Sequence, residues 1–92
     1  MNDYERQLLK IAQKGGVKAF EELTAHHQVL VYNFMLNENS NEFTASQLTQ
    51  EVFVRIFEML TTNAAPEDFY ACIYRTAGEV SRQAACKSKM IS

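Results

Sequence analysis

The sequence contains two cysteines, one proline, no tryptophan and no long hydrophobic run. Cys72 and Cys86 are fourteen positions apart in one predicted helix, which is too far for a disulfide within the chain. No C-x-x-C pair is present to form a zinc or dithiol motif. No apolar run approaches the ~18 residues of a membrane span, and the charged start of the sequence lacks the apolar core of a secretion signal. We therefore predict a cytoplasmic protein with reduced cysteines and no membrane contact.

The sequence also lacks the residue patterns of common catalytic and metal sites. It has no G-x-S-x-G motif, Gly-rich phosphate loop or nucleophile–base signature. His26 and His27 are adjacent, and adjacent helical side chains point about 100° apart, so they cannot share a metal ion without further ligands. We predict that the protein is not an enzyme and holds no metal or cofactor.

The residues that are present have the pattern of a small all-α domain. Hydrophobic residues make up 47% of the chain, which favours one globular domain over residues 1–92. Apolar positions recur with a helical period in four stretches, and none alternates as a strand would. We expect a compact bundle of four helices: one from an Asp3 N-cap to Gly15–Gly16, then Val17–Leu36, Thr44–Leu60 and Pro66–Cys86, with connections at Asn37–Asn41 and Thr61–Ala65.

The apolar stripe of each predicted helix indicates its buried side. The stripes are Tyr4, Leu8, Ile11 and Ala12; Phe20, Leu23, His27, Leu30, Val31 and Phe34; Ala45, Leu48, Val52, Ile56, Met59 and Leu60; and Phe69, Cys72, Ile73, Thr76, Ala77, Val80 and Ala84.

The predicted helix over Thr44–Leu60 combines a capping motif with an unusual polar side. Thr44 and Gln47 have the T-x-x-Q spacing of a capping box. Val54 interrupts the polar side, and two interpretations remain open: an isolated surface apolar residue, which is common, or part of a partner-binding surface. The polar side comprises Gln47, Gln50, Glu51, Arg55 and Glu58, with Phe57 at its edge.

Charge is distributed unevenly along the chain. The net charge is −2, but residues 1–74 carry −5, from ten acids and five basic residues, and residues 75–92 carry +3. A basic end permits contact with a polyanion, although cations also stabilise any helix C-terminus. The charged residues of this end are Arg75, Arg82, Lys87, Lys89 and Glu79.

Two tyrosines precede the basic residues on the last predicted helix. Tyr70 and Tyr74 lie one turn apart, off the main apolar stripe. Aromatic rings beside cations can stack on single-stranded bases. The alternative is that both rings pack at the edge of the bundle and keep their hydroxyls in water.

Three motifs in order resemble a known family. They are A-F-E-E-L (Ala19–Leu23), L-T-Q-E-V-F-V-R-I-F (Leu48–Phe57) and F-Y-A-C-I-Y-R-T-A (Phe69–Ala77). The set resembles the second conserved region of bacterial sigma-70-type factors, above all the extracytoplasmic-function group. The resemblance covers about residues 17–89.

The resemblance implies a transcription-initiation function. The L-T-Q-E helix of the family docks on the β′ clamp helices of RNA polymerase, and the last helix melts and reads the −10 promoter element. The segment Thr61–Phe69 corresponds to the loop that captures a flipped base. By position in these motifs, the resemblance implies that the polymerase-binding residues are Gln47, Gln50, Glu51, Val54 and Arg55. It implies that the DNA-binding residues are Tyr70, Tyr74, Arg75, Arg82 and Lys87. An anti-sigma factor is a further implied partner.

The departures from the family pattern gather at the DNA-reading end. Cys72 replaces a usual Trp, and Gly78-Glu79 replaces Arg-Asn. A glutamate beside DNA phosphates is repulsive, and a lost arginine removes a contact that releases counterions. Gln47 and His27 also stand where the family has an acid and a tyrosine. The alternative function is thus a sigma-like interaction module that no longer reads DNA. The second helical domain of the family, which reads the −35 promoter element, is not in these residues. We therefore expect the chain to be either one domain of a longer factor or a short, divergent relative.

Overall fold

The computed structural model describes residues 1–62 and 66–91, with side chains described as far as residue 86 in the last helix. Within these residues the protein is an all-α domain with four helices and no strand, which confirms the predicted fold class. The helices are α1 (Asp3–Gln13), α2 (Val17–Asn39), α3 (Glu42–Thr62) and α4 (Phe69–Ile91). The predicted connection Thr61–Ala65 falls partly outside the described residues, at 63–65.

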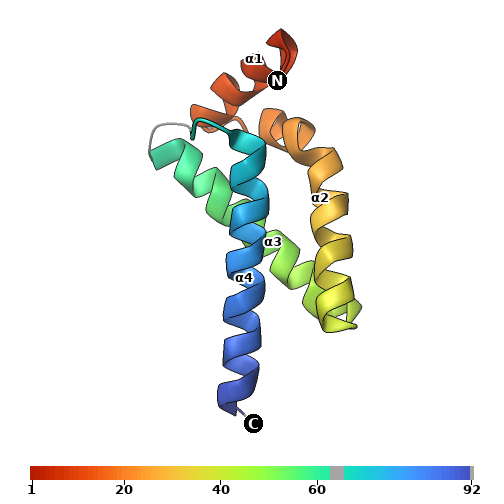
Figure 1. Cartoon of the computed structure of the whole chain (residues 1–92). Helices are drawn as coiled ribbons and strands as arrows, with labels where there is room; N and C mark the ends of the chain where they lie inside the picture. Colours follow the sequence, from red (N-terminus) through yellow and green to blue (C-terminus); the bar gives the residue numbers. More distant parts are fainter. Residues whose placement is uncertain (63–65, 92) are drawn as a thin grey trace.

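The α2–α3 pair forms the centre of the domain. These helices pack most extensively against each other, α1 packs on both, and α4 packs mainly on α3. Figure 1 shows α1 across one end of the pair and the C-terminal part of α4 extending past the α2–α3 turn at the other end. The buried apolar residues form one cluster: Leu8, Ala12, Ala19, Phe20, Leu23, Val31, Met35, Ala45, Val52, Phe53, Ile56, Leu60, Phe69, Ile73, Ala77 and Val80.

Helix α1 is capped at both ends by its own sequence. Its N-cap is Asn2 rather than the predicted Asp3: the Glu5 N–H donates to Asn2 Oδ1 at 2.8 Å, and the Asn2 N–H donates to Glu5 Oε1 at 3.1 Å. Gly15 has a φ of +96°, which a side chain would disfavour. The Gly15 and Gly16 N–H groups donate to the Ala12 and Ile11 carbonyls, so the predicted glycine stop is a Schellman motif.

The turn between α2 and α3 is shorter than predicted, and the predicted α3 cap is wrong. Helix α2 continues to Asn39 and stops at Ser40, which takes the left-handed conformation with a φ of 53°. Asn41 then caps α3, because its Oδ1 accepts from the Thr44 N–H at 2.9 Å. Thr44 therefore lies inside the first turn and does not begin a capping box. A helix that stops at a left-handed residue other than glycine is hard to predict, because such residues seldom take this conformation.

Helix α4 also differs at both ends. It begins at Phe69 rather than Pro66, with Asp68 Oδ1 accepting from the Ala71 N–H at 3.0 Å, and it continues past Cys86 to Ile91. Of the predicted buried stripes, Tyr4, Ile11, Leu30 and Phe34 are exposed. Thr24 is buried instead, since its hydroxyl can donate to the Phe20 carbonyl at 2.8 Å and needs no water.

Candidate functional site

The predicted polymerase-binding residues lie together on the outer side of α3. We call Gln47, Gln50, Glu51, Val54 and Arg55 the α3 face. Gln47, Gln50 and Val54 are exposed, and Glu51 and Arg55 are half-buried. Val54 is 48% exposed, so a branched apolar side chain stands in water among polar neighbours. Val54 also lines an apolar groove between α2 and α3, so it belongs to a larger apolar surface and is not an isolated exposed valine.

The α4 side of the α3 face is held by polar contacts. An Arg55 Nη donates to Glu51 Oε2 at 2.6 Å, one turn away, and to Gln83 Oε1 of α4 at 2.7 Å. These contacts join α3 to α4 and restrict the guanidinium. Of the five face residues, Arg55 is thus the one whose replacement would also loosen the bundle.

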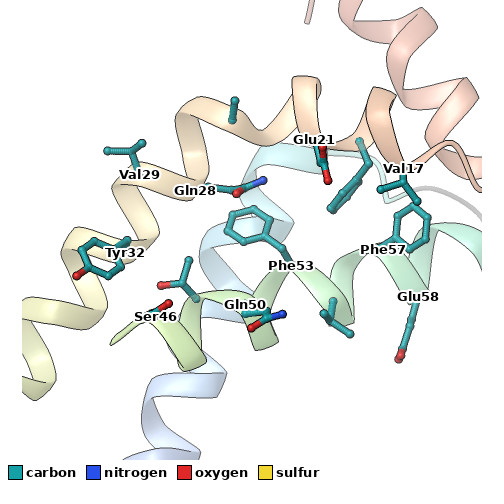
Figure 2. A pocket seen from close by; sticks show the side chains of 14 residues that line it. Val17, Glu21, Gln28, Val29, Tyr32, Ser46, Gln50, Phe53, Phe57 and Glu58 are labelled. Atoms are coloured by element: carbon teal, nitrogen blue, oxygen red, sulfur yellow. The ribbon is translucent and has the colours of Figure 1, made fainter. Parts of the chain in front are cut away.

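The other side of the α3 face borders a groove between α2 and α3. Figure 2 shows this α2–α3 groove, whose volume is about 950 Å³. Gln50 and Val54 belong to both the α3 face and the groove. The lining residues are Val17, Phe20, Glu21, Ala25, Gln28, Val29 and Tyr32 of α2, and Ser46, Thr49, Gln50, Phe53, Val54, Phe57 and Glu58 of α3.

The groove has an aromatic floor and valine walls. The Phe20 ring meets Phe53 and Phe57 edge to face, with centroids 6.5 and 5.1 Å apart, which fixes the floor. Val17 and Val29 of the walls are 55% and 58% exposed. Sequence periodicity missed this site because it depends on how α2 and α3 pack. The one available signal was the excess of apolar residues outside the single stripe assigned to each helix.

The charge in the groove is of one sign. Glu21 and Glu58 line it from opposite helices, and none of the described lining residues is a lysine or arginine. Figure 2 places both glutamates near the Val17–Phe57 end, while Tyr32 and Ser46 lie at the other end. The groove therefore combines a mainly apolar surface with the uncharged polar side chains of Gln28, Ser46, Thr49 and Gln50, and it is acidic at one end.

The two predicted DNA-binding tyrosines are engaged within the domain. The Tyr70 ring stacks on His27 of α2, with centroids 4.5 Å apart and planes at 26°, and its hydroxyl donates to Glu5 of α1. Nδ1 of His27 lies 2.7 Å from the Tyr74 hydroxyl. We call Glu5, His27, Tyr70 and Tyr74 the tyrosine cluster. It links α1, α2 and α4 through side chains that sequence analysis treated separately.

The surroundings of the tyrosine cluster favour the uncharged forms of the His27 and Tyr70 rings. Burial lowers the pKa of His27, with His26 acting in the same direction and Glu5 opposing it. Burial and the hydrogen bond to Glu5 raise the pKa of Tyr70 to about 12. The Tyr70 hydroxyl and the Asn2 N–H lower the pKa of Glu5.

The stacking of His27 on Tyr70 also bears on DNA binding. Because the imidazole occupies one face of the Tyr70 ring, a nucleobase could not stack on that face without displacing it.

The predicted basic residues Arg75 and Arg82 form no hydrogen bond or ring contact with the tyrosine cluster among the described residues, although Arg75 directly follows Tyr74 in α4. Arg75 and Arg82 are exposed, and neither forms an ion pair with another described residue, although Glu79 is exposed between them. Tyr74, Gly78 and Phe34 border a second, small apolar cavity of about 310 Å³ between α2 and α4. Lys87 lies outside the residues whose side chains are described.

The described side chains contain no group of three or more His, Cys, Asp or Glu that could hold a metal ion. The described helices include none that is long and apolar enough to cross a membrane. Cys72 is buried, with its Sγ 4.0 Å from the Met59 sulfur, and Cys86 is exposed; both are free thiols.

Comparison with known protein families, with curated proteins and with solved structures finds no match. The functional proposal therefore depends on the motifs of the chain and on the geometry of its surfaces.

Proposed function

We propose that this chain is a domain of the sigma-factor region 2 type, which docks on the β′ clamp helices of RNA polymerase and contributes to −10 promoter recognition. The observation that supports it best is the α3 face. Its two glutamines and Val54 are exposed side by side, although the helix that carries them is buried on its other side. An apolar residue between free amides suits a protein partner better than water.

Docking is tested with purified β′ clamp helices. We expect Gln50→Ala/Glu51→Ala to weaken binding at least tenfold, because it removes two polar contacts at the centre of the α3 face. A matched control is Asn37→Ala/Glu38→Ala, which changes an exposed amide and acid on α2, away from the α3 face. Equal binding by the two double variants, or no binding by the unchanged protein, would refute the docking proposal.

Promoter contact is the second part of the proposal. Arg75 and Arg82 are exposed and free to meet phosphates. We expect binding of single-stranded −10 DNA to weaken with salt, and Arg75→Ala/Arg82→Ala to reduce both affinity and the salt slope. Fluorescence anisotropy across a salt series measures both.

A second candidate function is an interaction module of sigma type that binds polymerase or an anti-sigma factor without reading DNA. The engagement of Tyr70 by His27 and Glu5 favours it, since this ring is occupied within the domain. The same salt series separates the two. No DNA binding at low salt, together with intact clamp-helix binding, would select the interaction module.

A further inference from the structure

The α2–α3 groove extends beyond the α3 face and runs along both helices. Its α3 lining recurs from Ser46 to Glu58 at three- and four-residue intervals, a length of about 18 Å at ~1.5 Å per residue. Its α2 lining extends from Val17 to Tyr32. A third helix laid between two neighbouring helices would bury both walls at once.

The walls present apolar side chains that the described part of the domain covers only in part. Val17, Val29 and Val54 are each about half exposed, and the rings of Phe20 and Phe53 in the same groove are largely buried. Aliphatic walls of this kind suit leucine, isoleucine or valine side chains at helical spacing. The described residues offer no free strand edge to which an extended peptide could pair.

The acidic end of the groove specifies the charge of the occupant. Glu21 of α2 points into the groove, and Glu58 lies at the α3 edge of the same end with its carboxylate directed away from α2. No lysine or arginine among the described lining residues neutralises them. A helix with acidic flanks would place like charges together at this end, whereas lysine or arginine there would be attracted by both carboxylates. At the Tyr32–Ser46 end, the described lining residues include no charged side chain.

We propose that the α2–α3 groove binds one amphipathic helix of a partner protein, with an apolar stripe along the groove and lysine or arginine at the end beside Glu21 and Glu58. This inference does not rest on the polymerase assignment, since it uses only the groove. Gln50 and Val54 line the groove and also belong to the α3 face, so a helix in the groove would compete with any partner of that face.

A display library of 18-residue helical peptides provides the test. Apolar residues are fixed at helical spacing, and the flanking positions are randomised among Lys, Arg, Glu and Gln. We expect selection on the unchanged protein to enrich peptides with Lys or Arg clustered at one end. The strongest enriched peptide, labelled for anisotropy, should bind Val29→Asp at least tenfold more weakly.

Three further variants test charge and location. Glu21→Lys/Glu58→Lys should lose at least tenfold in affinity for this peptide, whereas Glu38→Lys/Glu67→Lys, with the same charge change outside the groove, should lose less than threefold. Phe43→Asp replaces a 72% exposed apolar residue outside the groove and should bind as the unchanged protein does. Circular dichroism confirms that each variant is folded.

Failure to enrich any peptide would overturn the proposal. So would unbiased or acidic flanks, or binding that Phe43→Asp weakens as much as Val29→Asp does. The probe contains no polymerase, so a negative result here leaves the clamp-helix experiment to be decided by its own outcome.

Discussion

Replacing Gly78 by alanine should stabilise the domain. Gly78 lies in the interior of α4, where glycine is about 0.8–1.0 kcal/mol less favourable than alanine. Among the described residues, a Cβ at this position would meet only Arg82 Nη1, at 4.0 Å, which is ordinary contact with the end of a flexible side chain. No described neighbour therefore requires a glycine at this position, and the full difference in helix propensity should appear as a gain in stability.

The expected gain in the free energy of unfolding is about 1 kcal/mol, which for a domain of this size raises Tm by about 4–8 °C. Urea and thermal unfolding followed by circular dichroism at 222 nm, in the helical band, measure both quantities. The control is Gly16→Ala, whose Cβ would lie 2.5 Å from Ile11 Cγ2 and 2.9 Å from the Ile11 carbonyl oxygen. That variant should be destabilised, because the backbone at the α1–α2 junction must shift.

An unchanged or lowered stability of Gly78→Ala would refute this reasoning. It would mean that another segment packs against the Gly78 backbone or that α4 is not a regular helix there. If Gly78→Ala lost as much stability as Gly16→Ala, the structure would be wrong in giving a Cβ room at Gly78 but not at Gly16.

Three further predictions concern capping, pH and the core. Asn41→Ala should lower the free energy of unfolding in urea by about 1 kcal/mol and Thr44→Ala by less than half of that, because Asn41 supplies the α3 cap. A larger loss for Thr44→Ala than for Asn41→Ala would indicate instead that Thr44 is the cap, as the T-x-x-Q spacing predicted. The folded protein holds the pKa of His27 below its ordinary 6.5, so the unfolded chain binds more protons and stability should fall as pH drops below about 6.5. His27→Phe keeps a ring against Tyr70 but cannot be protonated, so its Tm should fall less between pH 7.5 and 5.5; an equal fall would exclude His27 as the cause. Met35→Ala should cost about 2–5 kcal/mol in urea unfolding, since Met35 is fully buried, and a loss below 1 kcal/mol would contradict its place in the core.

The sequence predicted the number, order and type of the helices because their apolar periods and the Gly15–Gly16 stop are local signals. It also predicted which side of α3 faces outward. Helix ends were less predictable where the stop depends on tertiary context. Ser40 takes a left-handed conformation that serine seldom adopts, and Asn37–Asn41 therefore reads as a longer loop than it is.

The candidate site was only partly predictable. Val54 stood out from its neighbours, but the groove beside it depends on the spacing between α2 and α3, which a helical period does not encode. Tyr70 and Tyr74 were singled out correctly as a pair off the apolar stripe. Their contacts with His27 and Glu5 join residues up to 65 positions apart, so no local pattern could show that Tyr70 is engaged.

The central proposal, polymerase docking through the α3 face, is tested most directly by photo-crosslinking from position 54. A photoreactive phenylalanine analogue is placed there, or at the exposed control position 43, and the protein is irradiated with core RNA polymerase. We expect crosslinks from position 54 to the β′ clamp helices, reduced by Gln50→Ala/Glu51→Ala, and few from position 43. No crosslink from position 54, or equal crosslinking from both positions, would contradict the proposal.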